Sequence, residues 1–165
     1  MRILGIDPGI AIVGWGVLDY ERFKFKPVAY DSIMTKAGLP VEERLSQIYD
    51  ALTAIMDRYK PEAMAVEELF WNTNQKTGIV VAEARGVVLL SARQRNIPIF
   101  EYTPLQVKQA VVGYGRAEKK QVITMVTALL ELEKPPKPDD TADALALAMC
   151  HAHVGSSVLS KYYKM

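Results

Sequence analysis

The amino-acid sequence predicts an α/β fold in which helices are layered on a mixed β-sheet. Three consecutive strand-like segments open the chain, and helical and strand-like segments then alternate to its end. That order favours a sheet with both antiparallel and parallel neighbours. The 165 residues, half of them hydrophobic, suffice for one domain with a sizeable core.

The composition excludes several other classes of protein. Charged residues make up 24% of the chain, and no apolar run approaches the roughly 20 residues of a membrane span. Asp7 falls where the apolar core of a signal peptide would lie. The single cysteine, Cys150, forms no disulfide framework, and with His151 and His153 it lacks a fourth zinc ligand. We therefore expect a cytoplasmic protein without a membrane segment and with structural histidines.

Three strands are predicted in the first part of the chain, over residues 2–7, 12–20 and 24–35. Pro8-Gly9 connects the first two strands, and a short polar stretch connects the second to the third. In the first strand Leu4 and Ile6 share one face, so Asp7 belongs to the opposite face. Asp7 ends this strand, where it either begins a solvated turn or has a more specific role.

The period of the hydrophobic residues changes after the third strand. Leu45, Ile48, Leu52 and Ile55 recur at helical spacing, and Pro61 follows the end of that segment. The same analysis predicts helices over residues 39–59, 76–96, 103–112, 117–132 and 139–154, and strands over residues 62–69 and 97–102. A polar loop that begins with two aromatic residues precedes the helix at 76–96.

The net charge of +1 does not by itself indicate a nucleic-acid partner, but basic residues gather in two segments. Segment 76–95 contains one acidic residue, Glu83, and segment 104–120 contains only Glu118. Their basic residues are Lys76, Arg85, Arg93, Arg95, Lys108, Arg116, Lys119 and Lys120. Such patches either neutralise phosphates or form solvated helix faces.

Four acidic residues stand where a carboxylate is poorly accommodated: Asp7, Glu67, Asp140 and Asp143. Glu67 follows an apolar strand, while Asp140 and Asp143 lie three residues apart and project from one helix face. Separately, each has an ordinary explanation as a turn former, strand end or helix cap. If their elements are neighbours, the carboxylates converge, and divalent cations such as Mg²⁺ relieve their repulsion. Two such ions stabilise the attacking and leaving oxygens of a phosphoryl displacement.

Five motifs follow one another along the chain: "GIDPGIAIVGWGV", "AVEELFWNTN", "ARGVVLLSA", "QVKQAVVGYGRAEKKQV" and "DDTADALALAMCHAH". Together they resemble the RuvC-type Holliday junction resolvases, four-way-junction endonucleases of the ribonuclease H-like superfamily. The resemblance extends from about residue 2 to residue 155. It implies an α/β ribonuclease H-like fold with a mixed five-stranded sheet flanked by helices. It also implies a nuclease domain over residues 1–155 and a short tail over residues 156–165.

The resemblance implies an activity and the residues that carry it. It assigns Asp7, Glu67, Asp140 and Asp143 as catalytic residues and as ligands of Mg²⁺, two ions per subunit, for which Mn²⁺ substitutes. Glu68 and Asp139 stand directly beside two of these acids and are the alternatives to them. Hydrolysis of a junction phosphodiester would leave 5′-phosphate and 3′-hydroxyl ends, which a ligase can seal in DNA recombination and repair.

The resemblance further implies a DNA-binding set that comprises Phe70, Lys108, Arg116, Lys119 and Lys120. Phe70 would push into the junction, and Lys108 and Lys119 would lie near the scissile phosphate. The other two basic residues would contact the DNA backbone. For Phe70 and Trp71 the alternative is that both cover the hydrophobic core.

The partners follow from the same resemblance. A homodimer would match a two-fold symmetric junction and give paired nicks on opposing strands. Segment 76–95 is apolar on more than one side, so it is buried either within the subunit or against a second copy, and it is the candidate dimer contact. A branch-migration motor complex is the other expected partner.

Three alternative functions stay open. The first is a ribonuclease H-like nuclease for RNA–DNA hybrids or structured RNA, against which the basic segment 113–120 favours the junction. The second is an actin-like ATP-binding module, but 165 residues leave no room for its second domain. The third is a junction-binding protein without catalysis, which would require that one of the four acids be missing.

Overall fold

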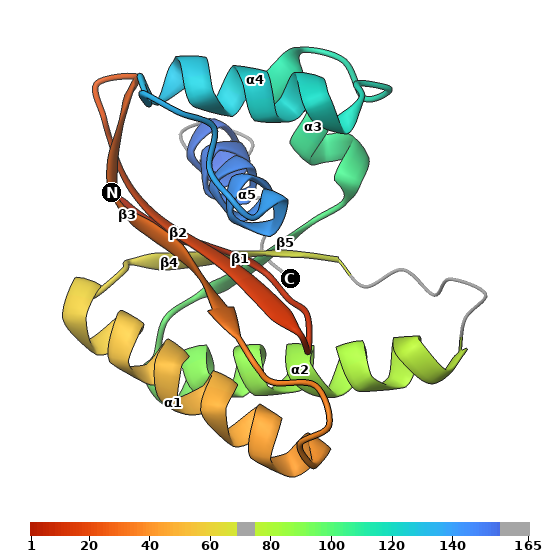
Figure 1. The fold of residues 1–165 in the computed structure, drawn as a ribbon. Coiled ribbons are helices and arrows are strands. Elements are labelled where there is room, and N and C mark those ends of the chain that lie inside the picture. The colour runs from red at the N-terminus through yellow and green to blue at the C-terminus, as the bar shows by residue number, and fades with distance from the viewer. Residues whose placement is uncertain (69–74, 156–165) are drawn as a thin grey trace.

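A five-stranded sheet separates two layers of helices in the computed structural model, which describes residues 1–68 and 75–155, without the side chains of residues 75–77 (Figure 1). The strands are β1 (Arg2–Asp7), β2 (Ile12–Glu21), β3 (Lys24–Met34), β4 (Ala63–Glu67) and β5 (Ile99–Tyr102). The helices are α1 (Val41–Tyr59), α2 (Gln75–Gln94), α3 (Pro104–Val112), α4 (Lys119–Leu129) and α5 (Asp139–Gly155). The predicted α/β class and the order of elements are confirmed.

The sheet is mixed, as predicted, and its order is β3-β2-β1-β4-β5. Strand β1 runs antiparallel to β2, and β2 runs antiparallel to β3. On its other side β1 is parallel to β4, which in turn is parallel to β5. The carboxyl ends of β1, β4 and β5 therefore meet at one edge of the sheet, where loops and helix ends form sites in α/β folds.

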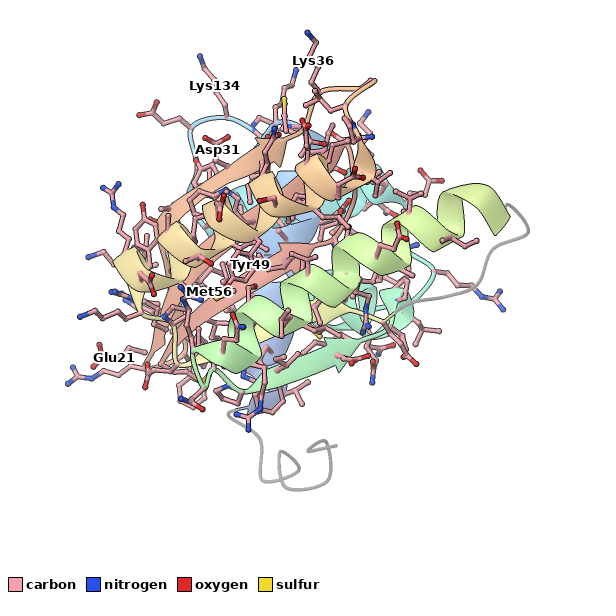
Figure 2. All side chains as sticks on the ribbon, turned by 90° about the horizontal axis from the view of Figure 1, so that it is seen from below. Glu21, Asp31, Lys36, Tyr49, Met56 and Lys134 are labelled. Carbon is pink, nitrogen blue, oxygen red and sulfur yellow. The ribbon has the colours of Figure 1, made fainter. Side chains whose placement is uncertain are left out.

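The alternation of side chains along β1 divides the core in two. Leu4 and Ile6 belong to a cluster with α1 and α2, which cover one face of the sheet (Figure 2). Ile3 belongs to the second cluster, with α3, α4 and α5 on the other face (Figure 1). Because Asp7 is an even number of residues from Ile3, it shares the face on which α5 lies. The predicted placement of Asp7 opposite Leu4 and Ile6 is thus confirmed.

Helix α5 lies directly on the backbone of β1 and β2. A Cβ atom at Gly5 would overlap the backbone carbonyl of Ala144, and one at Gly14 would overlap that of Asp140. At Gly16 a Cβ would instead collide with the side chain of Leu145. The glycines therefore remove the side chains that would otherwise separate helix and sheet.

The boundaries of the described elements agree closely with the sequence predictions. Helix α2, for example, begins at Gln75, one residue before its predicted start at residue 76. Phe70 and Trp71 lie outside the described residues, and so does the predicted tail at 156–165. Within residues 1–68 and 75–155, no helix combines the length and the apolar character that crossing a bilayer requires.

We expect Gly5 and Gly16, which both lie under α5, to differ in their tolerance of a methyl group. Gly5→Ala should lower the free energy of unfolding by about 3 kcal/mol, because a helix backbone cannot move aside locally. Gly16→Ala should cost only about 1 kcal/mol, since the Leu145 side chain can adopt another rotamer. Urea unfolding of both variants measures the difference, and equal stability of Gly5→Ala and the parent would contradict the proposed close contact.

Candidate active site

Three carboxylates from distant parts of the chain line one cavity: Asp7 at the end of β1, Glu67 at the end of β4 and Asp143 in the second turn of α5. The parallel register of β1 and β4 pairs Ile6 with Val66, so Asp7 and Glu67 follow directly after this last pair. Helix α5 crosses above them because the glycines let it approach. The condition under which the carboxylates converge, that β1, β4 and α5 be neighbours, is therefore met.

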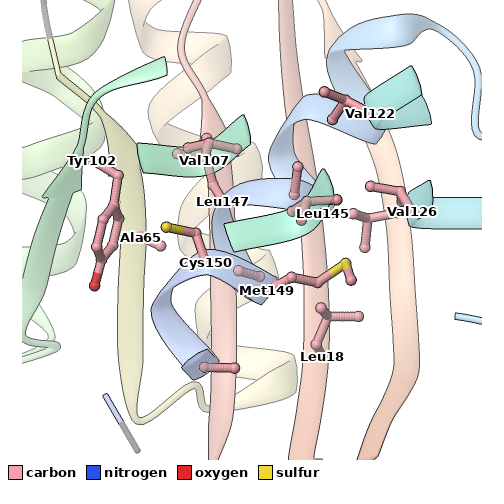
Figure 3. Packing of buried hydrophobic residues seen from close by; sticks show 14 of the residues in the cluster. Leu18, Ala65, Tyr102, Val107, Val122, Val126, Leu145, Leu147, Met149 and Cys150 are labelled. Atoms are coloured by element: carbon pink, nitrogen blue, oxygen red, sulfur yellow. The ribbon is translucent and has the colours of Figure 1, made fainter. Parts of the chain in front are cut away.

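The cavity measures about 210 Å³ and combines charged and apolar walls. Lys108 and Lys119 face it together with the carboxylates. The apolar lining consists of Pro104, Val107, Val122 and Leu147, of which the last three also belong to the core under α5 (Figure 3). Opposite charges in a partly apolar hollow attract each other more strongly than they would in water.

Two capping boxes place the lysines. The Thr103 side chain accepts from the Gln106 N–H at 3.1 Å, and the Gln106 side chain accepts from the Thr103 N–H at 2.8 Å. They start α3 so that Lys108 reaches the cavity. At α4 the Gln121 side chain accepts from the Glu118 N–H at 2.8 Å, which makes Lys119 the first helical residue. Each lysine is therefore held by a rigid helix.

Asp7 is the most strongly perturbed carboxyl group of the cavity. Burial raises its pKa to about 8, and repulsion from Asp143, Glu67 and Asp140 adds to the shift. Lys119 only partly offsets these effects. Burial also raises the pKa of Glu67, again with repulsion from Asp143 and with Lys119 opposing. The acids therefore hold unfavourable charge that a cation would relieve.

Lys119 supplies part of the missing positive charge. Its Nζ donates to Oδ2 of Asp143 at 2.8 Å. Burial nevertheless raises the pKa of Asp143, against the hydrogen bond and the attraction from Lys119. Burial acts to lower the pKa of Lys119, but the hydrogen bond and attraction to Asp143 outweigh it, so that this pKa is raised. The positive charge of Lys119 therefore offsets only part of the negative charge of the three carboxylates.

Asp140, Glu68 and Asp139 do not line the cavity. Asp140 is partly buried and is not part of the cavity lining, although its charge acts on both Asp7 and Asp143. Glu68 and Asp139 are exposed, and the Glu68 N–H donates to the Tyr102 carbonyl at 2.9 Å. The geometry therefore favours Glu67 over Glu68 as the residue that faces the cavity.

The predicted DNA-binding residues are distributed around this cavity. Lys108 and Lys119 line it, whereas Arg116 and Lys120 are exposed beyond its lining. Phe70 lies outside the described residues. Arg116 and Lys120 stand close in sequence to Lys119, which lines the cavity.

A buried contact that sequence reasoning missed joins Tyr102 on β5 to His151 on α5. The Tyr102 hydroxyl and Nδ1 of His151 are 2.7 Å apart, and the His151 ring centroid lies 4.2 Å from that of Phe100, with the two ring planes tilted by 34°. Burial lowers the pKa of His151 to about 4, so the imidazole is neutral at pH 7. His151 is therefore a packed core residue, in agreement with its predicted structural role, and its partners could not be inferred from spacing.

The cavity suits a hard divalent cation by its donors. Its acidic groups are all carboxylates, the ligand type that Mg²⁺ prefers, and raised carboxyl pKa values favour binding of positive charge. Among residues 1–68 and 75–155, however, no three acidic, histidine or cysteine groups stand close enough to hold one ion by themselves. Since Mg²⁺ commonly takes one or two carboxylates and completes its shell with waters and phosphates, the residues fit the ion.

Comparison with known proteins places the chain in a family. A family model described as "Crossover junction endodeoxyribonuclease RuvC" matches residues 3–151. The chain belongs to the RuvC family. The crossover junction endodeoxyribonuclease RuvC of Alkaliphilus metalliredigens is 58% identical over 155 residues, which are 94% of this chain and 94% of the relative. The resemblance inferred from the five motifs is thereby confirmed.

Two solved structures of Thermus thermophilus RuvC have the same fold. The first is 37% identical to this chain, with a TM-score of 0.85; the match covers 94% of this chain and 95% of the solved one. The other is T. thermophilus RuvC in complex with a Holliday junction substrate, 35% identical with a TM-score of 0.86 and the same coverage. The ribonuclease H-like fold expected for a RuvC family member is therefore confirmed.

Asp7 should make the metal-free protein less stable as the pH rises. Its pKa is about 8 in the folded chain against an ordinary value of 3.8. The folded chain therefore keeps a proton that the unfolded chain releases, and the free energy of unfolding falls as the pH rises from about 4 to about 8. Asp7→Asn should remove most of this loss and exceed the parent in stability at pH 8.

Urea unfolding from pH 5 to pH 8 in the presence of a chelator measures this effect. Asp50→Asn is the matched control, because Asp50 is an exposed acid of the same type on α1, on the face of the sheet opposite the cavity, and the variant should show the pH dependence of the parent. An Asp7→Asn variant with the pH dependence of the parent would contradict the described electrostatics of the cavity.

Proposed function

We propose that this RuvC family member resolves four-way DNA junctions by hydrolysing one phosphodiester in each of two opposing strands. The products would carry 5′-phosphate and 3′-hydroxyl ends. The observation that carries this proposal is the single cavity in which Asp7, Glu67 and Asp143 meet Lys108 and Lys119. Carboxylates hold the cations that such hydrolysis requires, and lysines bind the substrate phosphate.

The proposed ligands of the metal are Asp7, Glu67, Asp140 and Asp143, with two Mg²⁺ ions per subunit and Mn²⁺ as a substitute. When bound, these ions supply the charge that makes the attacking water more acidic and stabilises the leaving oxygen. Asp140 is included on the basis of family membership; its charge acts on Asp7 and Asp143, but it stays outside the cavity lining.

The basic residues would bind the junction at increasing distance from the scissile bond. Lys108 and Lys119 line the cavity, so they would orient the reacting phosphate. Because Lys119 is paired with Asp143 in the protein without DNA, its ammonium group would exchange that carboxylate for the phosphate. Arg116 and Lys120 would contact the DNA backbone outside the cavity. Phe70 is proposed to enter the junction on the basis of family membership alone.

A homodimer would explain paired nicks, since a two-fold symmetric dimer presents two cavities to a two-fold symmetric junction. Helix α2 is the proposed contact. Ile79 and Leu90 are 55% and 52% exposed, and Gly86 lies between them at helical spacing with open space beside it. A branch-migration motor as partner and action in the cytoplasm are proposed from family membership.

The proposed function is tested with purified protein, a labelled four-way DNA junction and a linear duplex of the same sequence. We expect paired nicks in the junction alone, with Mg²⁺ and not with a chelator. Binding without cutting would instead indicate a junction-binding protein. Cutting of an RNA–DNA hybrid in preference to the junction would assign the chain to another ribonuclease H-like activity.

Glu67→Gln and Glu68→Gln form a matched pair of neighbouring variants. Glu67→Gln should lower the single-turnover cleavage rate by at least about 100-fold, because it removes a carboxylate that faces the cavity. Glu68→Gln should leave the rate within a few-fold of the parent, since Glu68 is exposed. Both variants should bind the junction normally in gel-shift assays. The reverse order of cleavage rates would make Glu68 the ligand.

Leu90→Glu should convert the dimer to a monomer, because it places a charge in the proposed contact on α2. Leu129→Glu on α4 is the matched control, since Leu129 is also an exposed leucine, at 39%. Light scattering after size-exclusion chromatography gives the molar mass of each variant. A dimeric Leu90→Glu protein would exclude this part of α2 as the contact.

A further inference from the structure

The side chain of Arg85 links helix α2, to which it belongs, to the neighbouring strands β4 and β5. Its Nη2 lies 2.7 Å from Oε2 of Glu101 on β5, and its side chain is only 13% exposed. From the same guanidinium, Nε donates to the backbone carbonyl of Glu67 at 3.4 Å. One side chain on α2 thus contacts the last residue of β4 and a residue of β5.

The backbone around Glu67 has few other restraints. The pairing of β4 with β1 ends at Val66, one residue before Glu67. On the β5 side, Glu67 is in register with Tyr102, and the Glu68 N–H donates to the Tyr102 carbonyl. Arg85 adds a restraint from the helix layer on the opposite side of the sheet from α5 (Figure 1). The Glu67 peptide is thereby held from two directions.

The contact acts on the position of Glu67 and not on its charge. The pKa of the Glu67 carboxyl group is shifted by burial, by repulsion from Asp143 and by attraction from Lys119, whereas the guanidinium of Arg85 contacts the Glu67 backbone. The guanidinium offers separated donors in a rigid fork, so it can serve a carboxylate and a carbonyl at the same time. A lysine ammonium is a single point charge and can keep only one of these partners in good geometry.

We propose that Arg85 is a positioning residue for the nuclease reaction: together with Glu101 it fixes the backbone of Glu67 and so aims the Glu67 carboxylate into the cavity. This inference rests on the proposed function of Glu67. Groups that orient a metal-binding side chain commonly contribute roughly 10–100-fold to metal affinity or activity. Loss of Arg85 should act on the cleavage step and leave junction binding intact.

The conservative variant Arg85→Lys tests the proposal, because it keeps the positive charge beside Glu101 and should fold. Arg95→Lys is the matched control. Arg95 forms a similar ion pair, with Asp57 at 2.7 and 3.0 Å, and directly follows the last residue of the same helix. Urea unfolding should give both variants similar stability, so that a difference in cleavage has a local cause.

The amide nitrogen chemical shift of Glu68 is the readout that does not depend on activity. This nitrogen is bonded to the Glu67 carbonyl, so its shift responds to the hydrogen bond from Arg85. We expect it to move in Arg85→Lys and to stay constant in Arg95→Lys. An unchanged shift in both variants would overturn the proposed contact.

In single-turnover cleavage, Arg85→Lys should be slower than the parent by roughly 10–100-fold and should need more Mg²⁺ for its half-maximal rate. Arg95→Lys should cut at the rate of the parent. A folded Arg85→Lys protein that cuts at the parent rate would overturn the inference. Glu67→Gln distinguishes failure of the proposed function from failure of this inference. If Glu67→Gln cuts normally, the proposed role of Glu67 is wrong. If Glu67→Gln is impaired and Arg85→Lys cuts normally, only the positioning role of Arg85 is wrong.

Discussion

The close approach of helix α5 to the sheet is the constraint on which the rest of this structure depends. It is possible because Gly5, Gly14 and Gly16 present no side chain to the helix. A helix held one side chain further away would not bring Asp143 to the ends of β1 and β4, where Asp7 and Glu67 stand. The residues of α5 from Ala144 to Ala152 are all buried, and they then fill the space over the sheet. Packing and site geometry therefore have a common origin.

The site shows where stability and function conflict. Burial raises the pKa values of Asp7, Glu67 and Asp143, so each carboxylate costs free energy in the folded protein. Lys119 offsets part of this cost through its contact with Asp143. A core selected for stability alone would place apolar groups at these positions, as it does at Val107 and Leu147 next to them. The retained repulsion is a driving force for binding cations.

Local patterns in the sequence determined much of the fold and part of the site. The alternation of Leu4 and Ile6 placed Asp7 on the face that α5 covers, and the helical spacing of Asp140 and Asp143 placed both on α5. Spacing could not tell that only Asp143 lines the cavity, because this depends on how the first turn of α5 lies over Gly14.

The contacts that the sequence could not predict join residues far apart in the chain. They are the contacts of Lys119 with Asp143, Arg85 with Glu101, and Tyr102 with His151. No periodicity relates such positions, and only the tertiary structure brings them together.

The carboxylates of the cavity lie far apart in the sequence, which affects when the cavity can form during synthesis. Asp7 leaves the ribosome before Glu67, and Glu67 long before Asp143. A growing chain therefore has no assembled carboxylate cluster, and no charged cavity, until α5 has docked on the sheet.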